Sequence, residues 1–223
     1  MRNRPVVTID GPSGAGKTTV SKRLAEAAGM VRVDAGAMYR AVALAARRAG
    51  VSWDDPVRLG GVARELDYSF RTVAGSPRIF LSGEDVSEAI RTPEISMGAS
   101  AVSAHGPVRE ALVAKQREMA REGGVVLEGR DTGTVVFPDA EVKFFLDAAA
   151  AVRARRRQLE IPPPGAQSFE EVLRDVLRRD VQDSTREHSP LRVADGAVYI
   201  DSTTMTVDEV VGKMLRHLSM AAQ

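Results

Sequence analysis

Short runs of apolar residues recur along the chain, separated by longer stretches whose apolar residues follow a helical period. The runs are VVTID (6–10), VRVD (31–34), VVLEG (125–129), VKFFLD (142–147) and AVYID (197–201). Each run is rich in β-branched residues and apolar over most of its length, which is typical of strands buried on both faces of a parallel sheet. We therefore expect five parallel strands.

Helical patterns with start and stop signals lie between these runs. One helix should end at Gly29 and a second, over about 37–49, at Gly50, because glycine readily adopts the left-handed conformation that ends helices. Pro107 can begin a third helix, which the glycines at 123–124 end.

Two capping boxes mark the starts of later helices. Ser168 with Glu171, and Thr206 with Glu209, have the spacing in which each side chain bonds the other residue's backbone N–H. Strands that alternate with helices in this way predict an α/β fold with a doubly wound parallel five-stranded sheet.

One segment breaks the alternation. Residues 66–81 (LDYSFRTVAGSPRIFL) contain two strand-like runs around an Ala-Gly-Ser-Pro turn, which predicts a β-hairpin inserted into the α/β core. The segment 160–167 (EIPPPGAQ) breaks any helix, so we expect an exposed or mobile loop there. The 223 residues suffice for one domain with a small insertion.

Composition excludes several classes of protein. With 43% hydrophobic and 27% charged residues the chain should be globular, and without cysteine it has no disulfide framework. The N-terminal apolar run is too short for a signal peptide or a membrane span, so we expect a cytoplasmic protein that does not bind membranes. A net charge of +1 argues against a role in coating nucleic acid.

The segment GPSGAGKTT matches the phosphate-binding pattern G-x-x-x-x-G-K-[ST]. Its glycines let successive backbone N–H groups surround a phosphate at the start of a helix. Lys17 would reach the β- and γ-phosphates, and the Thr18 hydroxyl would ligate Mg²⁺. A chance match is the alternative, but a strand before the segment and a helix after it favour a functional loop. The predicted ATP-binding residues are Gly11, Pro12, Ser13, Gly14, Ala15, Gly16, Lys17, Thr18 and Thr19.

The phosphate loop does not define the reaction. The guanine-reading Asn-Lys-x-Asp of regulatory GTPases is absent, and Glu128 is only a rough match to the acid that ends a motor ATPase strand. A kinase for a small anionic acceptor is therefore the leading hypothesis. A kinase for UMP or a hydroxy acid, and a nucleotide-binding regulator that transfers nothing, remain as alternatives.

Arginines indicate a second anion site. Lysine occurs only at 17, 22, 115, 143 and 213, so arginine supplies most of the 31 basic side chains. Arg40 and Arg130 follow two of the predicted strands, at the sheet edge where doubly wound folds bind ligands. Surface ion pairing is the ordinary role of such arginines. The glycines around Arg130–Asp131 favour a functional role instead.

Two further groups of charged residues share a helix face. Arg179, Asp183 and Arg186 are spaced at i, i+4 and i+7. Arg153, Arg156 and Arg157 form a second group, just before the proline-rich segment. A solvated charged face is the usual explanation. The alternative is an arm whose arginines cover a triphosphate and neutralise the transferred phosphoryl group.

Several motifs together resemble the bacterial-type cytidylate kinases, a family of P-loop nucleoside monophosphate kinases. They are TIDGPSGAGK, DAGAMYR, GEDVSEAIRTPE, VREAL, EGRDTGTVVFPDA, KFFLDA and YIDSTTMT, collinear over nearly the whole chain. The resemblance implies Mg²⁺-dependent transfer of the ATP γ-phosphoryl group to CMP or dCMP. We expect the transfer to be direct and in-line, and the enzyme to be a monomer. The same resemblance implies a single kinase domain with a monophosphate-binding insertion at 63–100 and a lid at 150–165.

The resemblance also implies roles for individual residues. Ser100, Arg109 and Asp131 would face cytosine; Arg40, Arg130 and Arg186 would hold the acceptor phosphate; Arg179 and Asp183 would meet the sugar, with Tyr39 nearby. The implied catalytic residues are Lys17, Arg130, Arg156, Arg157 and Arg186. The family usually has serine where this chain has Ala35, so we expect weaker or broader pyrimidine selectivity. Scattered histidines 105, 188 and 217 are expected to be structural or surface residues.

Overall fold

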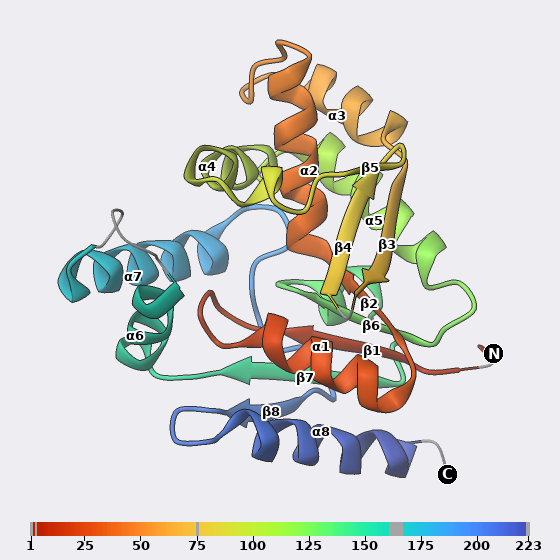
Figure 1. Cartoon of the computed structure of the whole chain (residues 1–223), viewed down its shortest axis with the longest axis vertical. Helices are drawn as coiled ribbons and strands as arrows, with labels where there is room; N and C mark the ends of the chain where they lie inside the picture. Colours follow the sequence, from red (N-terminus) through yellow and green to blue (C-terminus); the bar gives the residue numbers. More distant parts are fainter. Residues whose placement is uncertain (1, 3, 75, 161–166, 222–223) are drawn as a thin grey trace.

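A five-stranded parallel sheet forms the centre of the computed structural model, which describes residues 2, 4–74, 76–160 and 167–221 (Figure 1). The strand order is β2-β6-β1-β7-β8. The strands are β1 (Val6–Asp10), β2 (Val31–Asp34), β6 (Val125–Gly129), β7 (Val142–Asp147) and β8 (Val198–Asp201). The predicted doubly wound sheet is confirmed, and each expected strand begins or ends within one residue of the observed one.

Helices cover both faces of the sheet. On one face, α1 (Lys17–Ala28) and α8 (Val207–Ala221) pack against β1, β7 and β8 in a buried cluster that includes Leu24, Phe144 and Met214. On the other face, α2 (Ala35–Arg48) and α5 (Gly106–Met119) share a second cluster with Val6 and Leu127. Because both faces are covered, β1 is buried at every position, as its apolar sequence predicts.

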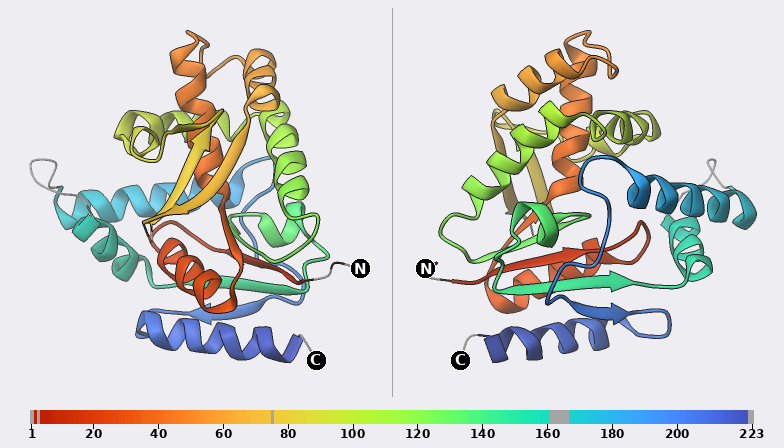
Figure 2. Two further views of the ribbon diagram at one scale, coloured as in Figure 1. Left: turned by 45° about the vertical axis from the view of Figure 1, so that its right-hand side comes forward. Right: turned by 180° about the vertical axis from the view of Figure 1, so that it is seen from behind.

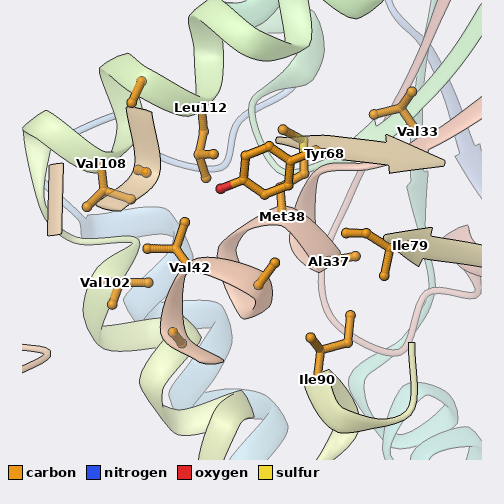
Figure 3. Packing of buried hydrophobic residues seen from close by; sticks show 14 of the residues in the cluster. Val33, Ala37, Met38, Val42, Tyr68, Ile79, Ile90, Val102, Val108 and Leu112 are labelled. Atoms are coloured by element: carbon orange, nitrogen blue, oxygen red, sulfur yellow. The ribbon is translucent and has the colours of Figure 1, made fainter. Parts of the chain in front are cut away.

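The expected hairpin is present between α2 and α5. It consists of β3 (Tyr68–Val73) and β4 (Ser76–Leu81), extended by the short antiparallel β5 (Glu84–Asp85). Residue 75, within its predicted turn, lies outside the described residues. Tyr68 and Ile79 of the hairpin lie in the same buried cluster as Met38 of α2 and Leu112 of α5 (Figure 3). The hairpin is therefore anchored on the core through α2 and α5.

Three shorter helices complete this region. They are α3 (Pro56–Glu65), the 3₁₀ turn Ala89–Arg91 and α4 (Pro93–Val102). The indole of Trp53 packs against α4 so closely that a Cβ atom on Gly98 would lie 2.4 Å from the ring. Trp53 also donates a 3.1 Å hydrogen bond to the Ala43 carbonyl of α2. Trp53 therefore fixes the position of α4 relative to α2.

Local signals define most helix ends. Gly29 has φ of 60° and ends α1, as expected. Helix α2 begins at residue 35, two residues before the expected start, because the Asp34 carboxylate caps it by accepting from the Ala37 N–H at 2.8 Å. Both predicted capping boxes are formed, at Ser168–Glu171 and at Thr206–Glu209.

Helices α6 (Ala150–Glu160) and α7 (Phe169–Thr185) pack on each other and extend past the edge of the sheet (Figure 2). The loop predicted at 160–167 falls mostly on residues 161–166, which lie outside the described residues. Within the described part of the chain, no helix has the length and apolar character needed to cross a membrane.

Candidate active site

The phosphate loop between β1 and α1 has the backbone shape that its glycines predict. Gly14 has φ of +79°, and a Cβ atom there would lie 2.9 Å from the Arg153 carbonyl oxygen. A Cβ atom on Gly11 would lie only 1.9 Å from the Leu146 carbonyl oxygen of β7. No larger residue fits at either position without moving the backbone, so the loop needs both glycines.

Lys17 lies across this loop. Its ammonium group donates to the carbonyl oxygens of Gly11 and Pro12, each at 2.7 Å. Burial, followed by the positive charge of Arg130, holds the pKa of Lys17 well below its usual value. A buried ammonium group that donates only to neutral carbonyl oxygens is stabilised further by an anion, so Lys17 is well placed to bind a phosphate.

A single cavity of about 290 Å³ runs from the phosphate loop to the arginine-rich elements. Six of the nine predicted ATP-binding residues line it, namely Ser13, Gly14, Gly16, Lys17, Thr18 and Thr19. Every predicted CMP-binding residue lines it as well: Tyr39, Arg40, Ser100, Arg109, Arg130, Asp131, Arg179, Asp183 and Arg186. Residues far apart in the sequence therefore share one chamber.

Carboxylates position the arginines of this chamber. Arg109 forms a buried ion pair with Asp131 and also donates to the Ser103 carbonyl at 3.1 Å. Arg130 donates through Nε to Asp183 of α7 at 2.7 Å. These contacts join α5, the loop after β6 and α7, so charge pairing holds three separate elements around the cavity.

Positive charge nevertheless dominates the far end of the cavity. Burial and the neighbouring Arg130 lower the pKa of Arg179 to about 10. Burial and Arg109 likewise lower the pKa of Arg186. Burial raises the pKa of Tyr39 to about 12, so its hydroxyl stays protonated at neutral pH. Such crowding of cations favours the binding of an anionic ligand.

The three arginines expected to cover the triphosphate have different positions. Arg157 lines the cavity and donates to the Ser13 hydroxyl at 3.1 Å. Arg156 is not among the cavity-lining residues and donates to Ser202 after β8. Arg153 is buried and holds Asp180 of α7 in a bidentate pair at 2.9 and 2.7 Å. Sharing one helix face therefore did not give them one role.

Two carboxylates at strand ends in the site were not among the predicted site residues. Asp34 and Glu128 stand side by side at the ends of β2 and β6, and both line the cavity. In the sequence, Glu128 is only a rough match to a motor-type acid, and no role is assigned to Asp34. Their position directly after apolar strand residues is the signal that could have identified them.

A third carboxylate connects the two halves of the site. Asp10 is buried at the end of β1 and accepts hydrogen bonds from the backbone N–H groups of Thr132 and Gly133 at 2.9 and 2.7 Å. The Thr132 hydroxyl donates to it as well, at 2.7 Å. Asp10 directly precedes the phosphate loop and therefore links that loop to the segment that follows Arg130 and Asp131.

Comparison with known proteins agrees with this architecture. The cytidylate kinase family model matches residues 7–220. A cytidylate kinase of Geobacter sulfurreducens is 54% identical over 94% of this chain and 90% of its own length. One of Pasteurella multocida is 42% identical over 98% of this chain and 96% of its own.

Solved structures support the fold at much lower identity. A shikimate kinase from Bacteroides thetaiotaomicron superimposes with a TM-score of 0.50 at 14% identity, over 96% of this chain and 98% of its own. That likeness concerns the fold alone. The family model and the relatives extend over nearly the whole chain. They include the phosphate loop, the ends of β2 and β6 that carry Asp34 and Glu128, and α7. This chain is a phosphotransferase that belongs to the cytidylate kinase family.

Proposed function

We propose that this enzyme transfers the γ-phosphoryl group of ATP to CMP or dCMP, giving CDP or dCDP. One observation carries the proposal: a phosphate loop and a cluster of arginines around a buried carboxylate lie at the two ends of one cavity. The names of the relatives supply the acceptor class. We further propose that the enzyme acts as a monomer on free nucleotides in the cytoplasm.

The donor end is suited to ATP with Mg²⁺. Backbone N–H groups of the loop and the Lys17 ammonium would hold the phosphates. The Thr18 hydroxyl and Glu128 fit the ion, because Glu128 Oε2 is buried beside the cavity without a hydrogen-bond partner among the described residues. Held by these residues, magnesium would supply positive charge that neutralises the phosphates.

The acceptor end is suited to a pyrimidine monophosphate. Arg40, Arg130 and Arg186 would hold its phosphate, since guanidinium groups bind phosphate oxygens in a bidentate way. Arg179 and Asp183 would contact the sugar hydroxyls.

Three residues on three different elements would recognise the base. The Asp131 carboxylate and the Ser100 hydroxyl can accept from the exocyclic amine of cytosine, and Arg109 can donate to its carbonyl and ring nitrogen. Uracil has an acceptor where cytosine has this amine, so the pattern disfavours UMP.

Direct in-line transfer requires no strong general base, because an ionised phosphate is already nucleophilic. The work of the protein is then to position the two nucleotides and to neutralise the charge that spreads during transfer. Lys17, Arg130, Arg157 and Arg186 line the cavity where that charge would develop. Arg156 would act from outside it, by holding the loop after β8 and the Ala15 carbonyl. We propose that 63–100 is the monophosphate-binding insertion and that 150–165 is the lid, of which the structure describes residues 150–160.

An acceptor panel tests the proposal. ADP release is measured with ATP, Mg²⁺ and each of CMP, dCMP, UMP, AMP, GMP and shikimate. We expect CMP and dCMP to give by far the highest kcat/KM, with UMP weaker. A protein that released no more ADP with any acceptor than with water would instead be a nucleotide-binding regulator. Equal use of AMP or GMP would contradict the assignment of the base site, and preference for UMP or shikimate would support the alternative acceptors.

A further inference from the structure

Arg32 places a charge in β2, the edge strand of the sheet, at a position where the side chain is largely buried. It lies in the middle of β2, and its side chain is only 10% exposed. Nε donates to the Ser21 hydroxyl of α1 at 2.8 Å, and Nη2 donates to Asp34 at 3.2 Å and to Glu128 Oε1 of β6. Arg32 itself does not line the nucleotide cavity, whereas both of its carboxylate partners do.

The two carboxylates need a counter-charge. Asp34 and Glu128 are register partners on adjacent parallel strands, so their side chains emerge close together at the same edge of the sheet. Burial and the neighbouring Asp34 raise the pKa of Glu128, whereas Arg32 and Lys17 oppose this shift. Burial would also raise the pKa of Asp34, but Arg40 and Arg32 outweigh it and hold that pKa below its ordinary value. The cations around the pair are thus Arg32, Arg40, Arg91 and Lys17.

Lys17 is the cation that Glu128 would otherwise attract. The two groups interact electrostatically across the cavity wall. In this structure the Lys17 ammonium instead bonds the loop carbonyls, and Arg32 occupies Glu128 Oε1. A buried carboxylate released from Arg32 would compete with the triphosphate for Lys17, because buried opposite charges pair strongly once their water is lost.

Arg32 also balances charge where ATP would bind. Asp34 pairs with both Arg32 and Arg40, whereas the ion pair that the structure describes for Glu128 is the one with Arg32. Without Arg32, Glu128 would lose this ion pair in a poorly hydrated place. Its charge would then repel a triphosphate, and its orientation would no longer be fixed.

We propose that Arg32 is a positioning residue of the donor site, which holds Asp34 and Glu128 so that Lys17 and Glu128 Oε2 are available to magnesium-bound ATP. The inference rests on the proposed function only for the identity of the donor. It places affinity for the triphosphate partly in a residue that does not line the nucleotide cavity. Ser21 contributes by fixing the Nε side of the guanidinium group against α1.

Calorimetry with a non-hydrolysable ATP analogue and Mg²⁺ tests the proposal without catalysis. Arg32→Gln keeps hydrogen-bonding atoms but removes the charge, and we expect it to weaken binding of the analogue about tenfold. Arg32→Lys keeps the charge and should recover most of the loss. In steady-state assays the KM for ATP should rise with Arg32→Gln, while the KM for the acceptor stays within about twofold.

A matched control separates this effect from general loss of positive charge. Arg23→Gln removes an arginine from α1 whose side chain is 48% exposed and which pairs with Asp208 outside the site. It should leave binding of the analogue unchanged. Equal weakening by Arg23→Gln and Arg32→Gln would overturn the proposal, since a nonspecific charge effect would then explain both.

A double-mutant cycle identifies Glu128 as the group through which Arg32 acts. In a Glu128→Gln background, Arg32→Gln should change binding of the analogue less than about twofold, because the charge that it neutralises is gone. A full tenfold loss in that background would contradict the proposal. If Arg32→Gln does not fold but the double variant does, binding by the double variant decides; failure of both to fold would make Arg32 a folding residue only.

These results are independent of the acceptor. If the wild-type protein bound the analogue but phosphorylated neither CMP nor dCMP, the proposed function would fail. The calorimetric comparison of the Arg32 variants would still test the proposed role of Arg32 in binding the analogue.

Discussion

The two ends of the cavity are built by different means. The donor end is one continuous loop whose backbone conformation, imposed by glycines, makes the binding surface. The acceptor end is assembled from α2, α4, α5, α7 and the loop after β6, and its binding surface consists of side chains. At the donor end the local backbone makes most of the binding surface and the Arg32–Glu128 pair supplements it, whereas at the acceptor end ion pairs such as Arg130–Asp183 must first bring remote elements together.

This difference has a consequence for how substitutions act. A change in the donor loop removes a contact but leaves its surroundings in place. A change in the acceptor region can also release a partner, because its arginines and carboxylates hold one another. We therefore expect donor and acceptor substitutions to separate in the KM values for the two substrates, from very large effects down to small ones.

The largest effect is expected at the donor end. Lys17→Ala removes the charge that faces the transferred phosphoryl group, and kcat/KM should fall about 1,000-fold, the scale seen when a preorganised charge donor is lost. Steady-state kinetics with thermal unfolding as a check would measure this. Lys22→Ala is the matched control, since Lys22 lies on the same helix with its side chain 38% exposed. A loss below about tenfold for Lys17→Ala would contradict its assigned role.

Asp131→Asn tests the acceptor end. Loss of the carboxylate removes an acceptor for the cytosine amine and weakens the hold on Arg109, so kcat/KM for CMP should fall about 100-fold. The KM for ATP should stay within about threefold, and relative use of UMP should rise because an amide can donate to uracil. Asp139→Asn, at an acid whose side chain is 69% exposed, controls for loss of charge. If Asp131→Asn impaired the use of CMP and of ATP equally, the two ends of the cavity would not be functionally distinct.

Gly98→Ala tests whether the position of α4 affects binding of the acceptor only. The added Cβ would lie 2.4 Å from the Trp53 ring, so α4 must shift, and with it the cavity-lining Ser100. We expect a loss of about 2 kcal/mol in the free energy of unfolding and a several-fold rise in the acceptor KM. Trp53 fluorescence and denaturant titration follow the change, since the chain has 1 tryptophan. Gly61→Ala, with nothing within 4 Å of the new Cβ, is the control.

Ala35→Ser should have the smallest effect and refines the acceptor end. Ala35 lines the cavity at the start of α2, so a hydroxyl there can reach an acceptor nucleotide. One added hydrogen bond is worth about 1 kcal/mol, which corresponds to roughly a fivefold gain in selectivity for CMP over UMP. Competition assays with both nucleotides measure this ratio. An unchanged ratio would show that a hydroxyl at this position does not contribute to selectivity for CMP over UMP.

The features predicted from the sequence are those that local physics determines. The five strands, the ends of α1 and the two capping boxes follow from runs of apolar residues, glycine conformation and short-range hydrogen bonds. The phosphate loop belongs with them, because its function resides in nine consecutive residues. The start of α2 was misplaced by two residues because an Asp cap was overlooked.

The roles of the charged residues could not be predicted as well from the sequence. Arg153 and Arg157 lie on one helix face, yet one is buried in a bidentate pair with Asp180 and the other lines the cavity. Arg32 looked like an ordinary residue of a strand, and only its contacts with Glu128 and Ser21 reveal it. Charge–charge contacts link residues far apart in the chain, so spacing along a helix or strand cannot specify them.

The sequence by itself determined where along the chain the five strands, the hairpin and the helices α1, α2, α5, α7 and α8 lie, as well as the donor loop and, through resemblance, the family. Only the tertiary structure decided which arginines face the cavity, which carboxylates hold them, and that Asp10 joins the phosphate loop to the segment after Asp131. The physical reason is range. Backbone conformation and burial depend on neighbouring residues, whereas a binding site made of side chains depends on which strand ends and helices the fold brings together.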